Sequence, residues 1–562
     1  MWRKRLCVVP AIAAGLISIM TPPASGVAAI DTQANRPQVS GDPASDATAR
    51  FPTNKQNEPT VAVNPLDSRR LIAGSNDEQR QPACGPGPVR GDVPQSDCSF
   101  FPNVGTSGIY TSSDGGKTWT NRGLLDDQRS WAGLPVGQRL VSDGDPVIVY
   151  GPRPDAAGRF AWRNGARAYY ATLASFFDNA GQYPPAKAPE FVAVAYSDDD
   201  GGTWSAPVLA TTKNNPNDFN DKESIWADDL ETSPYFGRIY VSYTEFRAGS
   251  EPIMVSTSTN GGRGFSAPKQ LSPAGNNATG NGRQGSMVRS GPDGTVYVAW
   301  EQGSSQVIST SSDGGTKWSR PRAIGPVDDI PDPLPGSNFR TDSFPSIAAD
   351  PRPGSTTVWA AWVTETPTGS RLVVASSHDR ASNWSAAAPV SSAAQGDAFF
   401  QGLDVAPNGR VDLAYQAQRA ADPSNFGTGN AVIDSWYVST LGGRPWSAPA
   451  KVSTASTDPA ATAQNNLERQ FMGDYNTLVS SADRAWFIWT DARNGKGCPA
   501  VDAYQRYLAD NGLAASDDEG DAGKDRSGHH DDPSDPSAKP APPVECPPQF
   551  GNSDVFVATI TT

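Results

Sequence analysis

A short turn motif recurs six times along this chain of 562 residues. The first copy, Ser112–Trp119, reads SSDGGKTW and follows the pattern Ser-x-Asp-x-Gly-x-Thr-Trp. Neighbouring copies begin 53 to 85 residues apart, and the later ones start at Ser197, Ser258, Ser311, Ser377 and Ser439. Self-similarity at such a period is typical of an array of repeated units, because each unit buries its apolar face against the next.

The motif predicts a tight turn between two strands. Its aspartate can accept hydrogen bonds from the next few backbone N–H groups, and its glycines can adopt the positive φ that the turn requires. The aromatic residue at its end is expected to fold back onto the sheet. We therefore interpret Asp114 and its equivalents as structural residues and expect function elsewhere.

Two further series of apolar segments recur with the same period. One contains short apolar strands ended by a turn. The other contains β-branched and aromatic residues in rough alternation, which is typical of strands with two different faces. The first series has seven members, which lie near residues 58, 145, 223, 285, 344, 402 and 474. One unit is thus four strands, and the chain is predicted to be an all-β, seven-bladed β-propeller, with six blades as the alternative.

The seventh unit lacks the motif and is interrupted. Its third strand is expected to begin at Asp554, and its fourth is expected from the N-terminal leader near Arg36–Ser40. Joining both chain ends in one blade closes the ring and removes open sheet edges. Between Asp510 and Glu545 the chain holds ten acidic residues against three basic ones. Few hydrophobic residues accompany them, so a disordered acidic insert is predicted at about 497–550.

The N-terminus has the pattern of an export signal. Basic residues precede an apolar run, Leu6–Met20, and small residues follow up to Ala29. We expect a signal peptide at 1–29, a leader at 30–56 and the propeller at 57–562; a membrane anchor is the alternative reading of the apolar run. Export favours disulfides, and proximity pairs the four remaining cysteines as Cys84–Cys98 and Cys498–Cys546.

Charge and composition exclude several function classes. A net charge of -14 disfavours nucleic acid and anionic membrane surfaces as partners. The chain has only three histidines; His378 lies in a turn motif, and His529 and His530 lie in the acidic insert. A Ser-His-Asp triad and a catalytic zinc site are therefore not expected, and neither is a cofactor. We expect a secreted monomer with no membrane contact once the signal is removed.

Charged residues and a tyrosine gather where the chain enters the first strand of each unit. In a propeller these entries converge at one mouth of the central channel. One side of the ring contributes three acids, Glu58, Asp145 and Glu223. The other side contributes three arginines, Arg283, Arg340 and Arg469, with Glu468 directly before the last of them. Asp474 and Tyr475 lie between the two sides around the ring.

The repeated turn resembles the Asp-box, or BNR, repeat of sialidases and related β-propellers. The resemblance implies a substrate-binding clamp of arginines, because a planar guanidinium suits bidentate recognition of a carboxylate. The implied substrate-binding residues are Arg283, Arg340, Arg469, Glu58 and Asp474. Sialidases carry a Phe/Tyr-Arg-Ile/Leu-Pro motif in the first blade, whereas the comparable stretch here, Asn57–Thr60, has no arginine.

The same resemblance implies catalytic residues. Sialidases use a tyrosine nucleophile paired with a glutamate, which is an exception to the two-carboxylate rule for glycosidases. Tyr475 would be the nucleophile, with Glu468 or Glu223 as its base, and Asp145 would be the acid/base.

Two functions from different classes remain open. The first is a secreted, sialidase-like glycoside hydrolase acting on extracellular glycans or glycoproteins. The second is a non-catalytic propeller that binds glycan or protein through the channel mouth. A third, structural interpretation is that the mouth charges pair with one another and hold the loops.

Overall fold

The computed structural model describes residues 27–37, 55–80, 104–176, 190–211, 219–247, 250–273, 282–442, 444–464, 467–513, 540, 543, 546–547 and 549–562. The predicted Cys84–Cys98 disulfide and most of the predicted acidic insert lie outside these residues, as does most of the predicted signal peptide.

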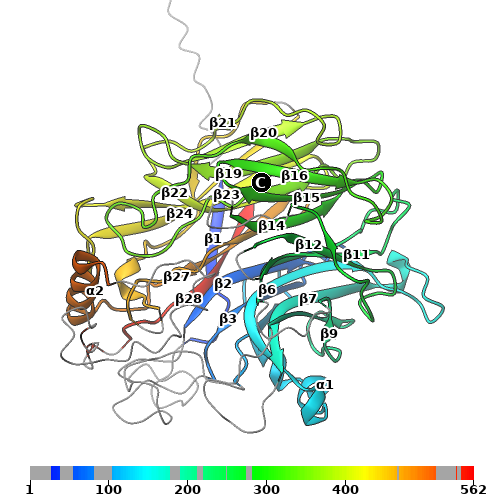
Figure 1. Ribbon diagram of the computed structural model, residues 1–562, viewed down its shortest axis with the longest axis horizontal. Helices are drawn as coiled ribbons and strands as arrows, with labels where there is room; N and C mark the ends of the chain where they lie inside the picture. Colours follow the sequence, from blue (N-terminus) through cyan, green and yellow to red (C-terminus); the bar gives the residue numbers. More distant parts are fainter. Residues whose placement is uncertain are drawn as a thin grey trace, which may run out of the picture.

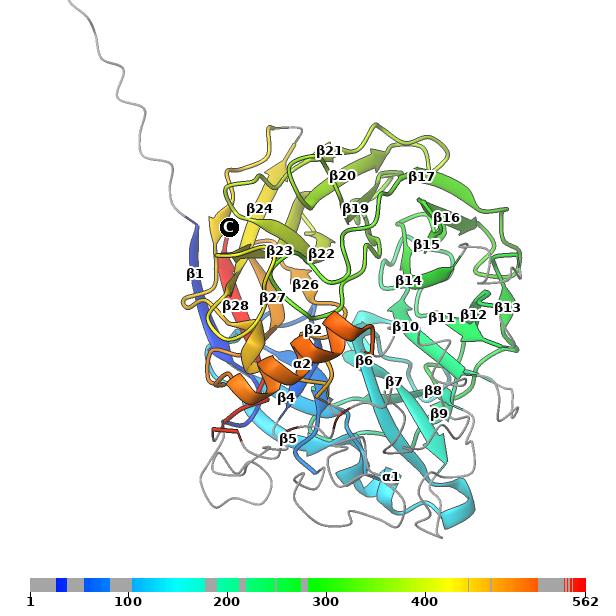
Figure 2. The same ribbon diagram turned by 60° about the vertical axis from the view of Figure 1, so that its left-hand side comes forward.

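Seven four-stranded antiparallel sheets form a closed ring of blades, which confirms the seven-bladed prediction and rules out six (Figures 1 and 2). The first three blades are β2 (Gln56–Val63), β3 (Leu71–Asp77), β4 (Gly108–Ser112) and β5 (Thr120–Leu124); β6 (Leu140–Pro152), β7 (Ala166–Phe176), β8 (Phe191–Ser197) and β9 (Val208–Leu209); and β10 (Phe219–Ala227), β11 (Ile239–Phe246), β12 (Ile253–Ser258) and β13 (Lys269–Gln270). A short helix, α1 (Arg129–Ala132), lies between the first two.

The next three blades follow in chain order. They are β14 (Arg283–Ser290), β15 (Val296–Gln302), β16 (Ser305–Ser311) and β17 (Arg322–Pro326); β18 (Ser346–Ala349), β19 (Val358–Thr364), β20 (Arg371–Ser377) and β21 (Ala388–Pro389); and β22 (Asp397–Val405), β23 (Arg410–Ala420), β24 (Ala431–Leu441) and β25 (Ala450–Lys451).

The seventh blade joins the two ends of the chain. It contains β26 (Thr477–Ser480), β27 (Arg484–Asp491), β28 (Asp554–Thr561) and, as its outer strand, β1 (Ala28–Gln33). The blue β1 and the red β28 lie side by side in Figure 2. The closing strand thus comes from the N-terminal region as predicted, but not from Arg36–Ser40. Pairing stops earlier because the Asn35 side chain accepts the hydrogen bond of Val555 N (3.0 Å) in place of a backbone carbonyl.

The repeated turn connects the third and fourth strands of the first six blades and is missing from the seventh, as the spacing predicts. In its first copy Asp114 Oδ1 accepts hydrogen bonds from Lys117 N (3.1 Å), Thr118 N (3.0 Å) and Ser112 Oγ (2.9 Å). The turn also contacts the preceding blade in the ring, since Trp486 Nε1 donates to Gly115 O at 3.0 Å. The aspartate therefore holds the turn.

The core is divided into layers between neighbouring blades. Seven hydrophobic clusters alternate with the seven sheets, and the cluster that closes the ring packs Val61 and Tyr110 of blade 1 against Trp486 and Val557 of blade 7. Full burial of each large apolar side chain stabilises the fold by roughly 1.5–3 kcal/mol. Because every cluster is shared between blades, the ring is stable only when it is closed.

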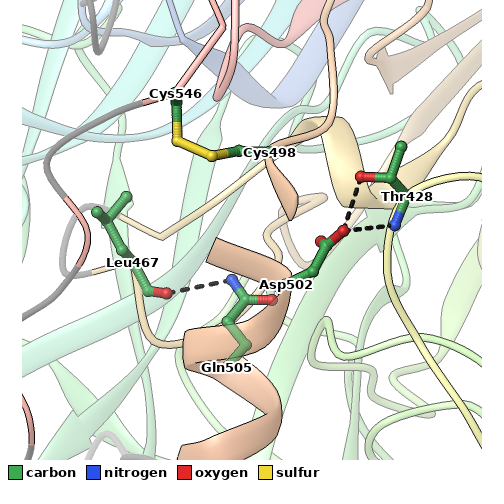
Figure 3. The surroundings of a disulfide bond; sticks show 6 residues. All are labelled: Thr428, Leu467, Cys498, Asp502, Gln505 and Cys546. Carbon is green, nitrogen blue, oxygen red and sulfur yellow. Dashed lines mark hydrogen bonds between the residues drawn. A yellow bond between two sulfur atoms is a disulfide. The ribbon is translucent and has the colours of Figure 1, made fainter. Parts of the chain in front are cut away.

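The chain between β27 and β28 begins with an ordered helix, α2 (Pro499–Asn511), which corrects the prediction that disorder starts near residue 497. The predicted disulfide Cys498–Cys546 is present at the base of α2, with a Cα–Cα distance of 5.3 Å (Figure 3). Asp502 accepts hydrogen bonds from Thr428 N and Oγ1 at 2.9 and 2.8 Å, and Gln505 donates to Leu467 O at 3.1 Å. The helix was not predicted because the acidic composition of the segment favours disorder.

Candidate functional site

A β-bulge lies near the start of the first strand in several blades and changes the direction of the chain there. The pairing register shifts in β2, β6, β10, β14 and β22. At three of these bulges a charged residue has a left-handed backbone, namely Glu58 (φ 52°), Asp145 (φ 52°) and Lys222 (φ 51°). Such a backbone costs energy in a residue with a side chain, and it persists where the surroundings enforce it, often at functional sites.

These bulges and the loops facing them bring a set of charged residues together at one end of the channel. We call this set the mouth cluster: Glu58, Asp145, Lys222, Glu223, Arg340, Asp342, Asp474 and Tyr475. All of its members except Lys222 and Asp342 belong to the site predicted from the sequence.

Asp474 is the centre of the mouth cluster. Its Oδ1 accepts a hydrogen bond from Arg340 Nε at 2.6 Å, its Oδ2 accepts one from Arg340 Nη2, and Lys222 Nζ also donates to Oδ2. Burial by itself would raise the pKa of Asp474, but Arg340 and Lys222 outweigh burial and hold this pKa well below its usual range. Asp474 is therefore ionised, and it neutralises two cations at once.

Glu58 and Asp145 form a carboxyl pair beside this centre. Burial raises the pKa of Glu58 well above its usual value, and the neighbouring carboxylates of Asp145 and Asp474 raise it further. Asn76 connects the two acids, because its Nδ2 donates to Glu58 Oε2 at 2.5 Å and its Oδ1 accepts from Asp145 N at 2.7 Å. Two acids so close do not both ionise readily, which favours the protonated form of Glu58.

Glu223 and Tyr475 carry polar atoms that have no hydrogen-bond partner among the described residues. These atoms are both carboxyl oxygens of Glu223 and the hydroxyl of Tyr475. Burial raises the pKa of both groups; Asp145 adds to the rise at Glu223, and Asp145 with Glu58 and Glu223 adds to it at Tyr475. Buried polar groups are normally paired, so Glu223 and Tyr475 are the candidate ligand-binding groups of the cluster.

Five members of the mouth cluster line one end of the central channel, which we call its floor. A cavity of about 820 Å³ follows the first strands of the blades, and the cluster members that line it are Lys222, Glu223, Asp342, Asp474 and Tyr475. Burial raises the pKa of Asp342 well above its usual value, and Asp474 adds to this rise. The floor therefore combines one firmly ionised carboxylate with two carboxyl groups that keep their protons more readily.

A second set of charges lies farther along the same cavity. The guanidinium of Arg289 stacks on the ring of Trp226, with 4.6 Å to its centroid. Burial lowers the pKa of Arg289 to about 10, opposed by the nearby acids Asp404 and Asp229. Burial raises the pKa of these two acids to about 6 and about 7, respectively.

The three arginines of the predicted clamp lie in separate surroundings. Arg340 binds Asp474, whereas Arg469 Nη2 lies 3.0 Å from Asp332 Oδ1. Arg283 lies at the entry of β14, where its backbone N donates to Glu251 Oε2 at 3.0 Å. None of the three is among the residues that line the cavity.

Glu468, predicted as one of two bases for Tyr475, lies beside α2 instead. Burial, with the Glu468 carboxylate nearby, raises the pKa of Tyr504 in α2 to about 12. The acids around the Tyr475 hydroxyl are Asp145, Glu58 and Glu223. Of the two alternatives, the geometry thus brings Glu223 to Tyr475.

Two of the mouth residues, Lys222 and Asp342, were given no role from the sequence, and Asn76 was not predicted. Lys222 occupies the same bulge position as Glu58 and Asp145, between Asp221 and Glu223, and this shared position was the available signal. Within the described residues no group of three or more histidine, cysteine or acidic side chains could hold a metal ion. No helix in the described ranges is long and apolar enough to cross a membrane.

Comparison with known proteins gives one local sequence match and several distant structural ones. No family model matches the chain. A sialidase of Bacteroides fragilis is 33% identical over 108 residues, which are 18% of this chain and 18% of the relative. The chain therefore matches less than a fifth of that curated relative's length, and the whole protein's activity is a matter for proposal.

Solved structures with low similarity include two sialidase-related enzymes. The Hadza microbial sialidase Hz136 has a TM-score of 0.36 at 15% identity, over 68% of this chain and 66% of that one. The intramolecular trans-sialidase of Ruminococcus gnavus has a TM-score of 0.37 at 14% identity, over 65% and 90%. A protein of unknown function from Dyadobacter fermentans has a TM-score of 0.40 at 14% identity, over 71% and 97%.

Proposed function

We propose that this protein is a secreted, sialidase-like glycoside hydrolase that acts on extracellular glycans at the mouth cluster, as a monomer. The observation that carries the proposal is the Tyr475 hydroxyl. It is buried on the floor of the channel, it has no hydrogen-bond partner among the described residues, and carboxyl groups of Asp145, Glu58 and Glu223 lie around it. A bound sugar would have to bring this phenol and one of the acids into hydrogen-bond contact, because a tyrosine nucleophile needs an adjacent base.

The proposed reaction has two steps. In the first, Tyr475 Oη attacks the anomeric carbon while Glu223 accepts the phenolic proton. The bond from that carbon to the leaving oxygen breaks, and the Glu58–Asp145 pair gives its proton to this oxygen, with Asp145 in contact with the leaving group. In the second step water attacks the anomeric carbon, the pair takes one water proton, and Tyr475 leaves and regains its proton from Glu223.

The raised pKa values fit these roles. A general base works best when its pKa lies near the pH of the reaction, and burial moves the pKa of Glu223 upward from the usual glutamate value. The acid must keep its proton at that pH, which the raised pKa of Glu58 provides for the pair. The local sequence similarity to a sialidase supports the same reaction class.

Export is part of the proposal. The Cys498–Cys546 disulfide fits an oxidising compartment. Cleavage of a signal peptide after Ala29 would leave Ile30–Gln33 paired with β28, so the mature chain would keep its closing strand. Residues 30–56 would then serve as the leader and 57–562 as the propeller.

One observation favours a non-catalytic glycan-binding or protein-binding propeller as the second candidate. Asp474 already neutralises both Arg340 and Lys222, so these cations are engaged without any ligand. A site of this kind can hold its loops in place and still present the channel to a partner.

Hydrolysis of fluorogenic glycosides by the purified mature protein separates the two candidates. We expect turnover of at least one glycoside, a loss of about 100-fold or more in kcat for Tyr475→Phe, and a similar loss for Asp145→Asn. Tyr507→Phe, on the exposed side of α2, is the matched control and should keep full activity. If the folded protein hydrolyses none of the glycosides, the hydrolase hypothesis is wrong and the non-catalytic binding propeller is the remaining candidate.

A further inference from the structure

We infer that the sugar bound at this site carries no carboxylate: the substrate class is a neutral glycoside and not a sialoside. This inference rests on the proposed function, because it concerns the substrate of the same site. Three observations carry it, namely the contacts of Asp474, the positions of the remaining arginines, and the charge of the channel.

Asp474 occupies the place that a substrate carboxylate would need. Its two oxygens accept both hydrogen bonds of the Arg340 fork, through Nε at 2.6 Å and through Nη2. Bidentate pairing of this kind is the way in which arginine recognises a carboxylate, so the fork is already filled by a residue of the chain. Lys222, the other cation of the mouth cluster, donates to the same carboxylate.

Among the described residues, the cations that line the cavity are Lys222, Arg289 and Arg352, and each has an acid beside it. Arg469 pairs with Asp332, and Arg283 lies near Glu251; neither lines the cavity. Arg352 is paired with Asp350 at the other end of the channel. Arg289 stacks on Trp226 with Asp229 and Asp404 near it.

The channel offers an anion no excess of positive charge. Seven acidic residues and three basic ones line it: Glu223, Asp229, Glu231, Asp342, Asp404, Asp474 and Asp483 against Lys222, Arg289 and Arg352. Burial raises the pKa of four of these acids, which favours their neutral form, and the three cations already have acids beside them. A neutral sugar needs no counter-charge there, whereas a carboxylate does. Hydroxyl groups of a neutral sugar can donate to the two Glu223 oxygens, which lack partners among the described residues.

The test compares charged and neutral substrates of the same format. The 4-methylumbelliferyl α-glycoside of N-acetylneuraminic acid is assayed beside the 4-methylumbelliferyl galactosides, glucosides, N-acetylglucosaminides and fucosides. We expect at least one neutral substrate to exceed the sialoside by about 100-fold or more in kcat/KM, which corresponds to the cost of a like-charge contact. A sialoside that is turned over best overturns the inference and leaves the hydrolase proposal standing.

Binding provides a readout that does not depend on turnover. Free N-acetylneuraminate and the free neutral sugars are titrated into the wild-type protein by calorimetry. If none of the glycosides is hydrolysed, the hydrolase proposal fails. In that case the inference is still supported if a neutral sugar binds and N-acetylneuraminate does not. It is overturned if N-acetylneuraminate binds or if none of the sugars binds.

The variant Asp474→Asn tests whether Asp474 is what keeps a substrate carboxylate away from Arg340 and Lys222. This substitution removes the resident charge from Arg340 and Lys222, so affinity for N-acetylneuraminate should rise roughly tenfold or more over wild type. Asp510→Asn removes an exposed acid of α2 that does not line the channel, and it serves as the control. An unchanged affinity in a folded Asp474→Asn variant contradicts the role given to Asp474, whereas the wild-type comparisons do not require that variant to fold.

Discussion

Asp474, which lines the floor of the channel, and Arg340, which does not, form a bidentate ion pair with 2.6 Å between Oδ1 and Nε. Asp474 belongs to the entry of the seventh blade and Arg340 to the entry of the fifth, so the pair links loops that are 134 residues apart in sequence. Lys222, from the bulge of the third blade, binds the same carboxylate. One aspartate thus ties three blades together at the place where the proposed chemistry occurs.

Asp474→Asn should destabilise the fold. The substitution leaves two buried cations without their counter-charge, and breaking a buried ion pair on one side costs about 3–5 kcal/mol. Urea denaturation measures the free energy of unfolding. Asp483→Asn is the control, because the Asp483 side chain is 66% exposed, and its effect should stay within about 0.5 kcal/mol. Equal stability of the two variants would mean that the pair contributes nothing.

Stability should fall as the pH rises from 4 to 8. Burial, with Asp228 nearby, raises the pKa of Asp229 to about 7, so the folded protein keeps a proton that the unfolded chain has released above its ordinary aspartate pKa. The stabilising contribution is therefore complete below about pH 4 and is lost as the pH passes through 7.

Asp229→Asn should reduce this decline by about 1–4 kcal/mol between pH 4 and pH 8. Urea denaturation at several pH values measures it, with Asp483→Asn as the control. An identical pH profile for Asp229→Asn and wild type would show that Asp229 is ionised in the fold throughout this range.

The disulfide at the base of α2 should stabilise the protein. Cys498 and Cys546 are 48 residues apart, and closing a loop of this size in the unfolded chain is worth roughly 2–5 kcal/mol. The double variant Cys498→Ser/Cys546→Ser should unfold at a lower temperature than wild type without reductant. Tyr507→Phe, on the same helix, should unfold at the wild-type temperature. No change in the double variant would show that packing alone holds α2.

The repeated turn should matter for stability and not for activity. Asp114→Ala removes the acceptor for the Lys117 and Thr118 backbone N–H groups, which should cost roughly 1–3 kcal/mol. Lys117→Ala keeps those backbone groups and should have little effect. The kcat of folded Asp114→Ala on the preferred glycoside should equal that of wild type; a large loss of kcat would place function at the turn.

The blades could be predicted because each leaves a local pattern. Seven first strands could be counted, and the turn motif marked the third and fourth strands of six blades. The closing strand was placed too late in the chain, at Arg36–Ser40 instead of Ala28–Gln33, because a side chain of Asn35 ends the pairing and no pattern of residues announces this. Helix α2 was missed because the acidic residues that follow it dominate the composition of the segment.

The location of the site residues could be predicted from the sequence, but the contacts between their side chains could not. Spacing along the chain placed Glu58, Asp145, Glu223 and Tyr475 at the same end of the channel, since each enters a first strand or precedes one. Spacing could not show how far an arginine reaches or which acid it meets. From the sequence, Arg283, Arg340 and Arg469 were equally good candidates for the clamp. In the structure Arg340 forms an ion pair with Asp474.

The most direct test of the account is covalent trapping of the proposed nucleophile. The 2-deoxy-2-fluoro glycosyl fluoride of the neutral sugar that is turned over best should form a long-lived adduct, because the fluorine slows hydrolysis of the intermediate. Mass spectrometry of the digested protein locates the adduct. The account predicts one sugar per protein, attached to Tyr475 and absent from Tyr475→Phe. An adduct on Glu223, Asp145 or Glu58, or turnover without any adduct on Tyr475, would contradict it.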